Sequence, residues 1–147
     1  MLSPEGRVVM VSGANRGIGL AIARCLHGKG YRLSLGARDR AKLDAALGGL
    51  DRARVLTAEF DARDRAGCEA WVERTASRFG GIDGLVNNAG IALNVGIEDD
   101  DEAAYDAMWE VNVKGPLRLV RLAMPWLRKS GNGRVVNLSS LSGKRVK

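Results

Sequence analysis

Three glycines in residues 12–19 are the first positions in the sequence whose type and spacing point to chemistry. They follow an apolar run over residues 7–11, which is typical of a buried strand, and a helical pattern of apolar residues begins inside the segment. Glycine lets the backbone turn tightly and approach a pyrophosphate, whose charge is met by the free N–H groups at the start of a helix. Because strand, turn and helix stand in the required order, the segment predicts a phosphate-binding turn.

Apolar runs of strand length alternate along the chain with longer stretches of helical spacing. The runs are apolar on both faces, which favours a parallel sheet covered by helices on both sides with right-handed crossovers. Ligands of such sheets bind beyond the carboxyl ends of the strands, so the turns after the strands should carry the site. The expected strands are residues 7–11, 31–35, 54–60, 84–87 and 134–139, and the expected helices lie at 18–26, 39–50, 68–79 and from 98–102 towards 129.

Composition places the chain among ordinary globular proteins. It has 147 residues, 46% of them hydrophobic and 27% charged, which excludes disordered, collagen-like and low-complexity chains. The 23 Lys and Arg residues exceed the 17 Asp and Glu residues, for a net charge of +6. Several arginines stand beside acids, however, and the basic run at 144–147 has no interleaved aromatic residues. We therefore expect no nucleic-acid partner.

Membrane and metal chemistry are not expected either. No apolar run comes near the roughly 18 residues of a membrane span, and the first residues lack the apolar core of a signal peptide. We therefore expect a cytoplasmic protein with no membrane partner. Two cysteines, Cys25 and Cys68, and one histidine, His27, cannot form a zinc site of the usual nitrogen and sulfur ligands. Free thiols suit a reducing cytosol.

Four ordered motifs resemble those of the classical short-chain dehydrogenase/reductase family. Residues 12–19 are similar to its cofactor motif Thr-Gly-x-x-x-Gly-Ile-Gly, with serine for threonine, and residues 87–90 are similar to its Asn-Asn-Ala-Gly. Asn112 matches the asparagine of its long helix, and residues 134–140 resemble the strand that ends in its catalytic serine. The resemblance implies an α/β fold with a Rossmann-type doubly wound parallel sheet, three α/β/α layers and strand order 3-2-1-4-5, with the family's last strands missing. It also implies a single NAD(P)-binding domain over residues 1–147.

The resemblance also indicates which nicotinamide cofactor to expect. Family members that prefer NAD carry an acid at the end of the second strand, where this sequence has Ala37 followed by Arg38. Arg16 stands where NADP-preferring members often have a basic residue, so two arginines can face one 2′-phosphate and we expect NADP(H) rather than NAD(H). Both arginines can instead be read as solvated residues of a turn and a helix start. The residues assigned to cofactor binding are Gly13, Asn15, Arg16, Gly17, Ile18, Gly19, Arg38, Asp61, Ala62, Asn88, Ala89 and Gly90.

Two of these assignments have structural alternatives. Asp61, followed by Ala62, resembles the family's Asp-Val pair beside the adenine ring, but an aspartate after a strand can equally cap a helix. Residues 88–90 can bond neighbouring strand ends while leaving room for the cofactor ribose, which is a largely structural role. The sequence leaves both readings open.

For the reaction itself, the resemblance implies two residues within the sequence. In the family a serine orients the substrate carbonyl, a tyrosine assisted by a lysine donates the proton, and an asparagine holds a proton-relay water. Ser140 matches the serine and Asn112 the asparagine, although these residues could also end a strand and satisfy backbone groups at a helix bend. The family's Tyr-x-x-x-Lys motif falls beyond residue 147, and neither Tyr31 nor Tyr105 has a lysine at that spacing.

The expected function is an NADP(H)-dependent oxidoreductase that transfers hydride between nicotinamide and a carbonyl or alcohol substrate. The alternative is a catalytically silent nucleotide-binding fragment of the same fold, which the chain would have to be if it ended at residue 147. We favour a longer chain, because Val135, Val136 and Leu138 would otherwise leave an apolar edge open on the last strand. The family likeness further implies a homo-oligomer, a dimer or tetramer, that acts on a small molecule.

Overall fold

The structure, a computed structural model, describes residues 3–96 and 98–140. Strands and helices alternate along it, and a π-helical segment divides the long helix into two α-helical parts. None of the helices in these ranges is long and apolar enough to cross a bilayer. The elements are β1 (Val8–Ser12), α1 (Gly17–Gly28), β2 (Arg32–Ala37), α2 (Arg40–Ala46), the 3-10 turn η1 (Arg52–Arg54), β3 (Val55–Glu59), α3 (Arg65–Phe79), β4 (Gly84–Asn87), α4 (Glu102–Trp109), the π-helical η2 (Glu110–Lys114), α5 (Gly115–Lys129) and β5 (Arg134–Asn137).

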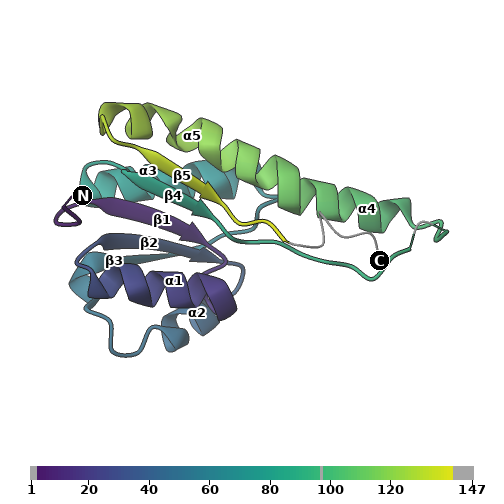
Figure 1. Cartoon of the computed structure of the whole chain (residues 1–147), viewed down its shortest axis with the longest axis horizontal. Coiled ribbons are helices and arrows are strands. Elements are labelled where there is room, and N and C mark those ends of the chain that lie inside the picture. Colours follow the sequence, from purple (N-terminus) through teal and green to yellow (C-terminus); the bar gives the residue numbers. More distant parts are fainter. Residues whose placement is uncertain (1–2, 97, 141–147) are drawn as a thin grey trace.

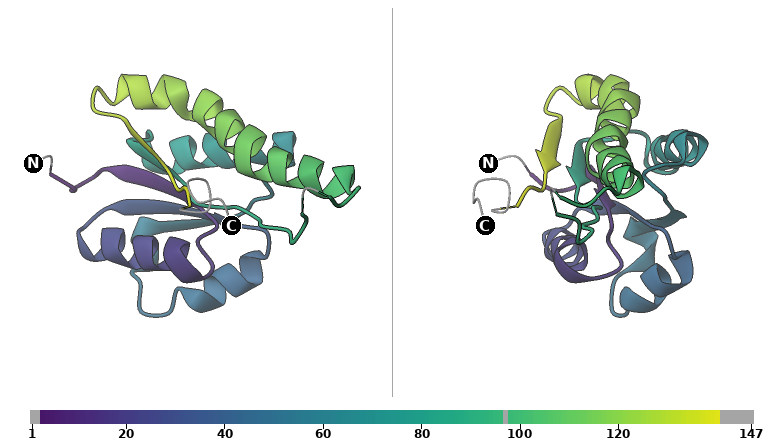
Figure 2. Two further views of the ribbon diagram at one scale, coloured as in Figure 1. Left: turned by 45° about the vertical axis from the view of Figure 1, so that its right-hand side comes forward. Right: turned by 90° about the vertical axis from the view of Figure 1, so that its right-hand side faces the viewer.

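The five strands form one parallel sheet with the order β3-β2-β1-β4-β5, which confirms the predicted topology. Figure 1 shows α1 and α2 on one face of this sheet and α3 and α5 on the other, so the expected three layers are present. The right-hand view of Figure 2 shows the same layers from the end towards which the strands point. Strands β2 and β3 follow on one side of β1, and β4 and β5 follow on its other side. The strand order therefore reverses between β1 and β4, and ligands of such sheets bind at this point.

Each face of the sheet buries its own apolar cluster, because successive strand residues point to opposite faces. On one face, Val9 and Val11 of β1 pack with Leu43 of α2. On the other face, Met10 of the same strand packs with Trp71 of α3. All of β1 is therefore buried, which explains why its sequence is apolar and does not alternate with polar residues.

Several element boundaries differ from the predicted ones, and two of these differences concern α2 and β2. The helix α2 ends at Ala46 instead of continuing to Leu50, because two glycines, which are weak helix formers, follow at 48–49. The strand β2 continues to Ala37, two residues beyond its predicted end, because its pairing with β3 continues as far as Glu59. This extension places Arg38 directly after the last strand residue.

The outer strand β5 presents the apolar edge that the sequence predicts. It pairs with β4 alone among the described residues. The side chains of Val135, Val136 and Leu138 are 38%, 49% and 40% exposed. By comparison, β4 on its inner side is buried at every position.

Three buried polar side chains fix α3 against β2. The indole N–H of Trp71 donates to Ser34 Oγ at 2.8 Å, and the hydroxyl oxygens of Ser34 and Thr75 are 2.7 Å apart. Thr75 Oγ1 also lies 2.8 Å from the carbonyl oxygen of Trp71 and donates to it. Since Thr75 uses its proton there, Ser34 donates to Thr75 while it accepts from Trp71. The three groups thus form one satisfied hydrogen-bond chain inside the core.

We expect Ser34→Ala to lower the free energy of unfolding by about 1–3 kcal/mol, because the buried indole N–H of Trp71 loses its acceptor. Urea unfolding of the chain and its variant measures the difference. The control is Ser77→Ala on the exposed side of α3, for which we expect a change below about 0.5 kcal/mol. Equal effects of the two substitutions would contradict the role given to Ser34.

Candidate functional site

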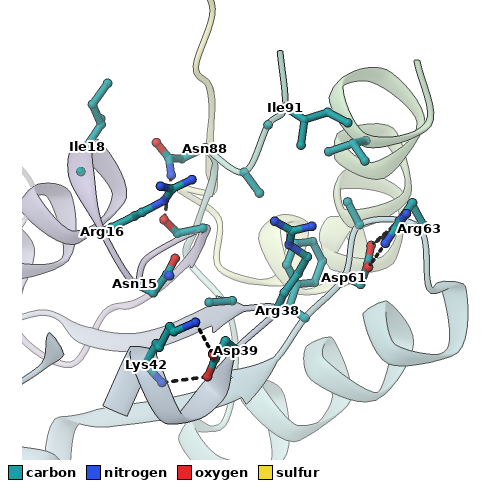
Figure 3. Close-up of a pocket in the computed structure, with 18 residues that line it drawn as sticks. Asn15, Arg16, Ile18, Arg38, Asp39, Lys42, Asp61, Arg63, Asn88 and Ile91 are labelled. Carbon is teal, nitrogen blue, oxygen red and sulfur yellow. Dashed lines mark hydrogen bonds and ion pairs between the residues drawn. The ribbon is translucent and has the colours of Figure 1, made fainter. Parts of the chain in front are cut away.

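A cleft of about 690 Å³ opens at the carboxyl ends of β1, β2, β3 and β4 (Figure 3). It lies where the strand order reverses, as expected for a ligand site of such a sheet. All the predicted cofactor residues except Gly19 line it, whereas Asn112 and Ser140 lie outside its lining. The lining residues are Gly13, Asn15, Arg16, Gly17, Ile18, Ala37, Arg38, Asp39, Lys42, Phe60, Asp61, Ala62, Arg63, Asn88, Ala89, Gly90, Ile91 and Val111.

The glycine-rich turn between β1 and α1 favours glycine at three positions. Gly13 and Gly17 have φ angles of 68° and 54°, in the left-handed region that side chains disfavour. At Gly19 the reason is space, because a Cβ atom there would lie 2.3 Å from the carbonyl oxygen of Gly13 and 2.5 Å from Asn88 Nδ2. Gly19 therefore lies beneath the turn and lets the backbone of α1 approach it, instead of lining the cleft.

The start of α1 faces the cleft with backbone N–H groups that have no acceptor within the helix. Bonding within the helix begins with the N–H of Leu20, which donates to the carbonyl of Arg16 at 3.2 Å. Arg16 occupies the N-cap position, and its side chain makes no capping hydrogen bond. The N–H groups of the first helical turn, together with the positive end of the helix dipole, are thus available to an anionic ligand.

The hydroxyl of Ser12 joins the ends of β1 and β4. It accepts hydrogen bonds from the backbone N–H groups of Asn88 and Ala89, both at 3.0 Å. In the other direction, Asn88 Nδ2 donates to the carbonyl oxygens of Ser12 and Gly13 at 2.9 and 3.1 Å. Asn88 and Ala89 therefore bond a neighbouring strand end, as the structural reading of this motif predicts, while residues 88–90 also line the cleft.

Ion pairs neutralise both carboxylates that line the cleft. Lys42 Nζ lies 3.0 Å from Asp39 Oδ2, and an Arg63 guanidinium nitrogen lies 2.7 Å from Asp61 Oδ2. The backbone N–H and then the ammonium group of Lys42 lower the pKa of Asp39. Hydrogen bonds from Arg63 lower the pKa of Asp61. Both acids are therefore ionised at neutral pH, and each one has its own cation.

Arg16 and Arg38 are the other two cations of the cleft. Neither forms an ion pair with any residue that the structure describes. In Figure 3, Arg38 extends from the end of β2 into the middle of the cleft, between the two ion pairs. The excess positive charge of the cleft therefore resides on these two arginines.

Asp61 does not cap a helix, so that alternative is wrong. Its Oδ1 atom accepts a hydrogen bond from the backbone N–H of Arg63 at 2.9 Å and closes a short turn after β3. The N-cap position of α3 belongs to Asp64. Asp61 is thus held at the wall of the cleft by its local turn and by the guanidinium of Arg63.

Asn112 lies in the π-helical segment η2 and binds the segment that follows β4. Its Oδ1 accepts from the backbone N–H of Ile91 at 2.9 Å, and its Nδ2 donates to the carbonyl of Ile91 at 2.8 Å. The side chain therefore satisfies the backbone of another segment, and not that of a bend in its own helix. Single π-helical turns are frequent at functional sites.

The helix that carries Asn112 is also anchored on the opposite side of the cleft. The guanidinium of Arg118 donates to the carbonyl of Ala62 and, at 2.8 Å, to Glu110 Oε1. Arg118, followed by Lys114, lowers the pKa of Glu110 and keeps it ionised. One helix thus contacts both the turn after β3 and the segment after β4.

Ser140 follows β5 and is exposed. The strand before it is held in register with β4, because Asn87 Nδ2 donates to Asn137 Oδ1 at 2.8 Å and the Leu138 N–H donates to the carbonyl of Asn87 at 2.9 Å. Ser140 thus follows β5 at the same edge of the sheet as the cleft. Residues 141–147, which include the basic run at 144–147, lie outside the described residues.

Sequence reasoning missed three side chains of the site. The bonding role of the Ser12 hydroxyl follows from a register between β1 and β4 that the motif alone does not reveal. Lys42 could have been found, because it lies three residues after Asp39 at the start of a helix, a spacing that brings side chains together. Arg63 carried no comparable signal, since its alignment with Asp61 depends on the turn after β3.

Comparison with known proteins gives the family. A model of the short chain dehydrogenase family matches residues 7–147. Agropine synthesis reductase of Rhizobium rhizogenes is 46% identical over 143 residues, which are 97% of this chain and 33% of that protein. An uncharacterised oxidoreductase of Staphylococcus saprophyticus is 34% identical over 149 residues, which are 99% of this chain and 64% of that protein. The chain thus spans between about one third and just under two thirds of these relatives.

Two solved structures are similar over most of the chain. A short-chain dehydrogenase/reductase from Brucella melitensis gives a TM-score of 0.80 at 36% identity, over 86% of this chain and 54% of that one. A metagenomic short-chain oxidoreductase in complex with NADP gives 0.88 at 34% identity, over 99% of this chain and 67% of that one. Since the family model extends over nearly the whole sequence, this chain belongs to the short-chain dehydrogenase/reductase family.

Proposed function

We propose that the protein is an NADP(H)-dependent oxidoreductase that transfers hydride between the nicotinamide and a carbonyl or alcohol substrate. The charge distribution of the cleft carries the proposal. Its two carboxylates are ion-paired, whereas Arg16 and Arg38 have no ion-pair partner among the described residues. The 2′-phosphate that distinguishes NADP from NAD is a dianion suited to such an arginine pair. The metagenomic relative, whose structure contains NADP, supports the same cofactor.

The backbone of the cleft suits the rest of the same cofactor. The left-handed turn at Gly13 and Gly17 and the free N–H groups at the start of α1 form a cradle for a pyrophosphate. Ala37 ends β2 with a buried methyl group, where an NAD-specific site needs a carboxylate for the ribose 2′-hydroxyl. The cradle and the missing acid therefore favour the phosphorylated cofactor.

In this proposal the bound nicotinamide supplies the hydride, and residues of the chain position the substrate. Ser140 donates a hydrogen bond to the substrate carbonyl oxygen, on which negative charge develops during reduction. Asn112 fixes the segment at Ile91 through both backbone groups of that residue and so shapes the wall beside the nicotinamide. The proton donor is the tyrosine of the family's Tyr-x-x-x-Lys motif, beyond residue 147.

A catalytically silent nucleotide-binding module of the same fold is the second candidate. No tyrosine is among the residues that line the cleft in the part of the chain that the structure describes. The hydroxyl of Tyr105 donates to the carbonyl of Gly96 at 2.5 Å, a contact that fixes a loop instead of facing the cleft. This observation favours the silent module if no Tyr-x-x-x-Lys segment accompanies the chain.

The family likeness also supports three broader proposals. The substrate is a small carbonyl or alcohol, which fits the oxidoreductase and reductase names of the relatives. The whole protein is a homo-oligomer, a dimer or a tetramer. It works in the cytoplasm, without a nucleic-acid or membrane partner.

We expect Arg38→Ala to weaken NADPH binding by about 10- to 100-fold, which is the value of a charge-assisted hydrogen bond. NADH binding should change by less than about threefold, because NADH has no 2′-phosphate. Fluorescence titration with each cofactor measures both dissociation constants. The control is Arg32→Ala at the other end of β2, which removes the same charge from an exposed position. Equal losses for NADPH and NADH would refute the assignment of Arg38.

We expect Gly19→Ala to abolish measurable NADPH binding, because its Cβ atom would push the turn away from Asn88 and Gly13. Gly28→Ala at the end of the same helix is the matched control, since a Cβ atom there meets nothing within 4 Å. That variant should bind NADPH normally and gain about 0.4–1 kcal/mol of stability. Circular dichroism of each variant shows whether it is folded. Normal binding by folded Gly19→Ala would contradict the cradle.

We expect Ser140→Ala to lower the rate of NADPH oxidation by about 100-fold on any ketone or aldehyde that the wild-type protein reduces. Its NADPH affinity should stay within about twofold of the wild-type value, because in the proposed role the serine contacts the substrate and not the cofactor. Ser139→Ala, one residue earlier, is the control and should retain the wild-type rate. NADPH binding without reduction of any substrate in a panel would establish the silent module instead.

A further inference from the structure

An ion pair lies in the cleft beside Arg38, and the function proposed above gives its lysine no role of its own. Asp39 Oδ1 accepts the backbone N–H of Lys42 at 2.9 Å, and Asp39 Oδ2 lies 3.0 Å from Lys42 Nζ. Both residues line the cleft with Arg38, and Figure 3 shows the pair at the base of α2 next to that arginine. An aspartate thus lies in the cleft next to the end of β2, although Ala37 and Arg38 leave no acid at the strand end itself.

An unpaired carboxylate at this place would reverse the selectivity of the cleft. It would repel a 2′-phosphate and could accept a hydrogen bond from a ribose 2′-hydroxyl, which is how acids at the end of a second strand select NAD. Asp39 is ionised and its side chain is 43% exposed, so burial does not suppress its charge. The ammonium group of Lys42 is the cation that neutralises it.

We propose that Lys42 is a specificity-determining residue, which keeps the Asp39 carboxylate in an ion pair and so prevents it from selecting NAD(H). The inference deepens the proposed NADP(H) function and rests on it. Lys42 acts on the cofactor through Asp39, and the direct phosphate ligands remain Arg16 and Arg38.

The lysine side chain contributes little to folding, so its effect on selectivity can be measured by itself. The cap of α2 uses the backbone N–H of Lys42, which any residue except proline supplies. The Lys42 side chain is 77% exposed, and ion pairs of such exposure contribute little stability. The same helix offers a matched control in Arg40, which pairs with Asp44 at 3.6 Å and lies outside the lining of the cleft.

The test compares NADPH and NADH affinities of the wild-type chain with those of Lys42→Met, which keeps side-chain length and helix propensity. We expect the ratio of the two dissociation constants to shift towards NADH by about 5- to 10-fold, as for one unscreened charge near the surface. NADH affinity alone should stay the same or improve. Arg40→Met removes an equal charge from the same helix and should shift the ratio by less than about twofold.

The double variant Lys42→Met with Asp39→Asn distinguishes two roles of Lys42, which are neutralising the Asp39 carboxylate and contacting the 2′-phosphate directly. Asparagine caps a helix as well as aspartate does, but it carries no charge. We therefore expect the double variant to regain the wild-type ratio within about twofold. If the ratio of the double variant stays as far from the wild-type value as that of Lys42→Met, the lysine binds the phosphate itself. The proposal that Lys42 acts by neutralising Asp39 is then wrong.

The inference and the proposed function can fail separately. A wild-type chain that binds NADH more tightly than NADPH refutes the proposed cofactor, whatever the variants do. A wild-type preference for NADPH that Lys42→Met leaves unchanged refutes the inference alone. The shift towards NADH in Lys42→Met, with its reversal in the double variant, supports both.

Discussion

The junction between the carboxyl ends of β1 and β4 is the contact on which the rest of the site depends. Ser12 accepts two backbone N–H groups of the segment after β4, and Asn88 returns two hydrogen bonds to the backbone after β1. These bonds join two strand ends that line the cleft on both sides of the point where the strand order reverses. Since the bonds use backbone groups, they fix the turn geometry independently of most neighbouring side chains. Glycine at positions 13 and 19 leaves the room for this close approach.

Charge pairing gives the cleft its chemical character. Six charged side chains line it, but the ion pairs of Asp39 with Lys42 and of Asp61 with Arg63 leave only two cations without a partner among the described residues. The number of charged residues therefore describes the site poorly. A net charge of +6 for the whole chain gives no hint of it, because most of the 23 Lys and Arg residues are not among the residues that line the cleft.

The helix from α4 to α5 connects the two walls of the cleft. Asn112 holds Ile91 after β4, and Arg118, one helical segment later, holds Ala62 after β3. The π-helical turn at Glu110–Lys114 changes the helical phase between these two contacts. A displacement of one wall is thus opposed by the other, which suits a site that must position two ends of one cofactor.

The sequence by itself determined the strand and helix order, the parallel sheet and the strand ends that carry the site, because apolar periodicity and glycine spacing are local properties. It also placed Arg16 and Arg38 in the site from motif resemblance. Only the tertiary structure decided that Asp61 closes a turn and does not cap a helix, that Asn112 binds Ile91, and that Ser12 joins two strands. The contacts of Asn112 and Ser12 join residues that are far apart in the sequence, and the contact of Asp61 depends on the exact geometry of a turn. The spacing of residues in the sequence encodes neither.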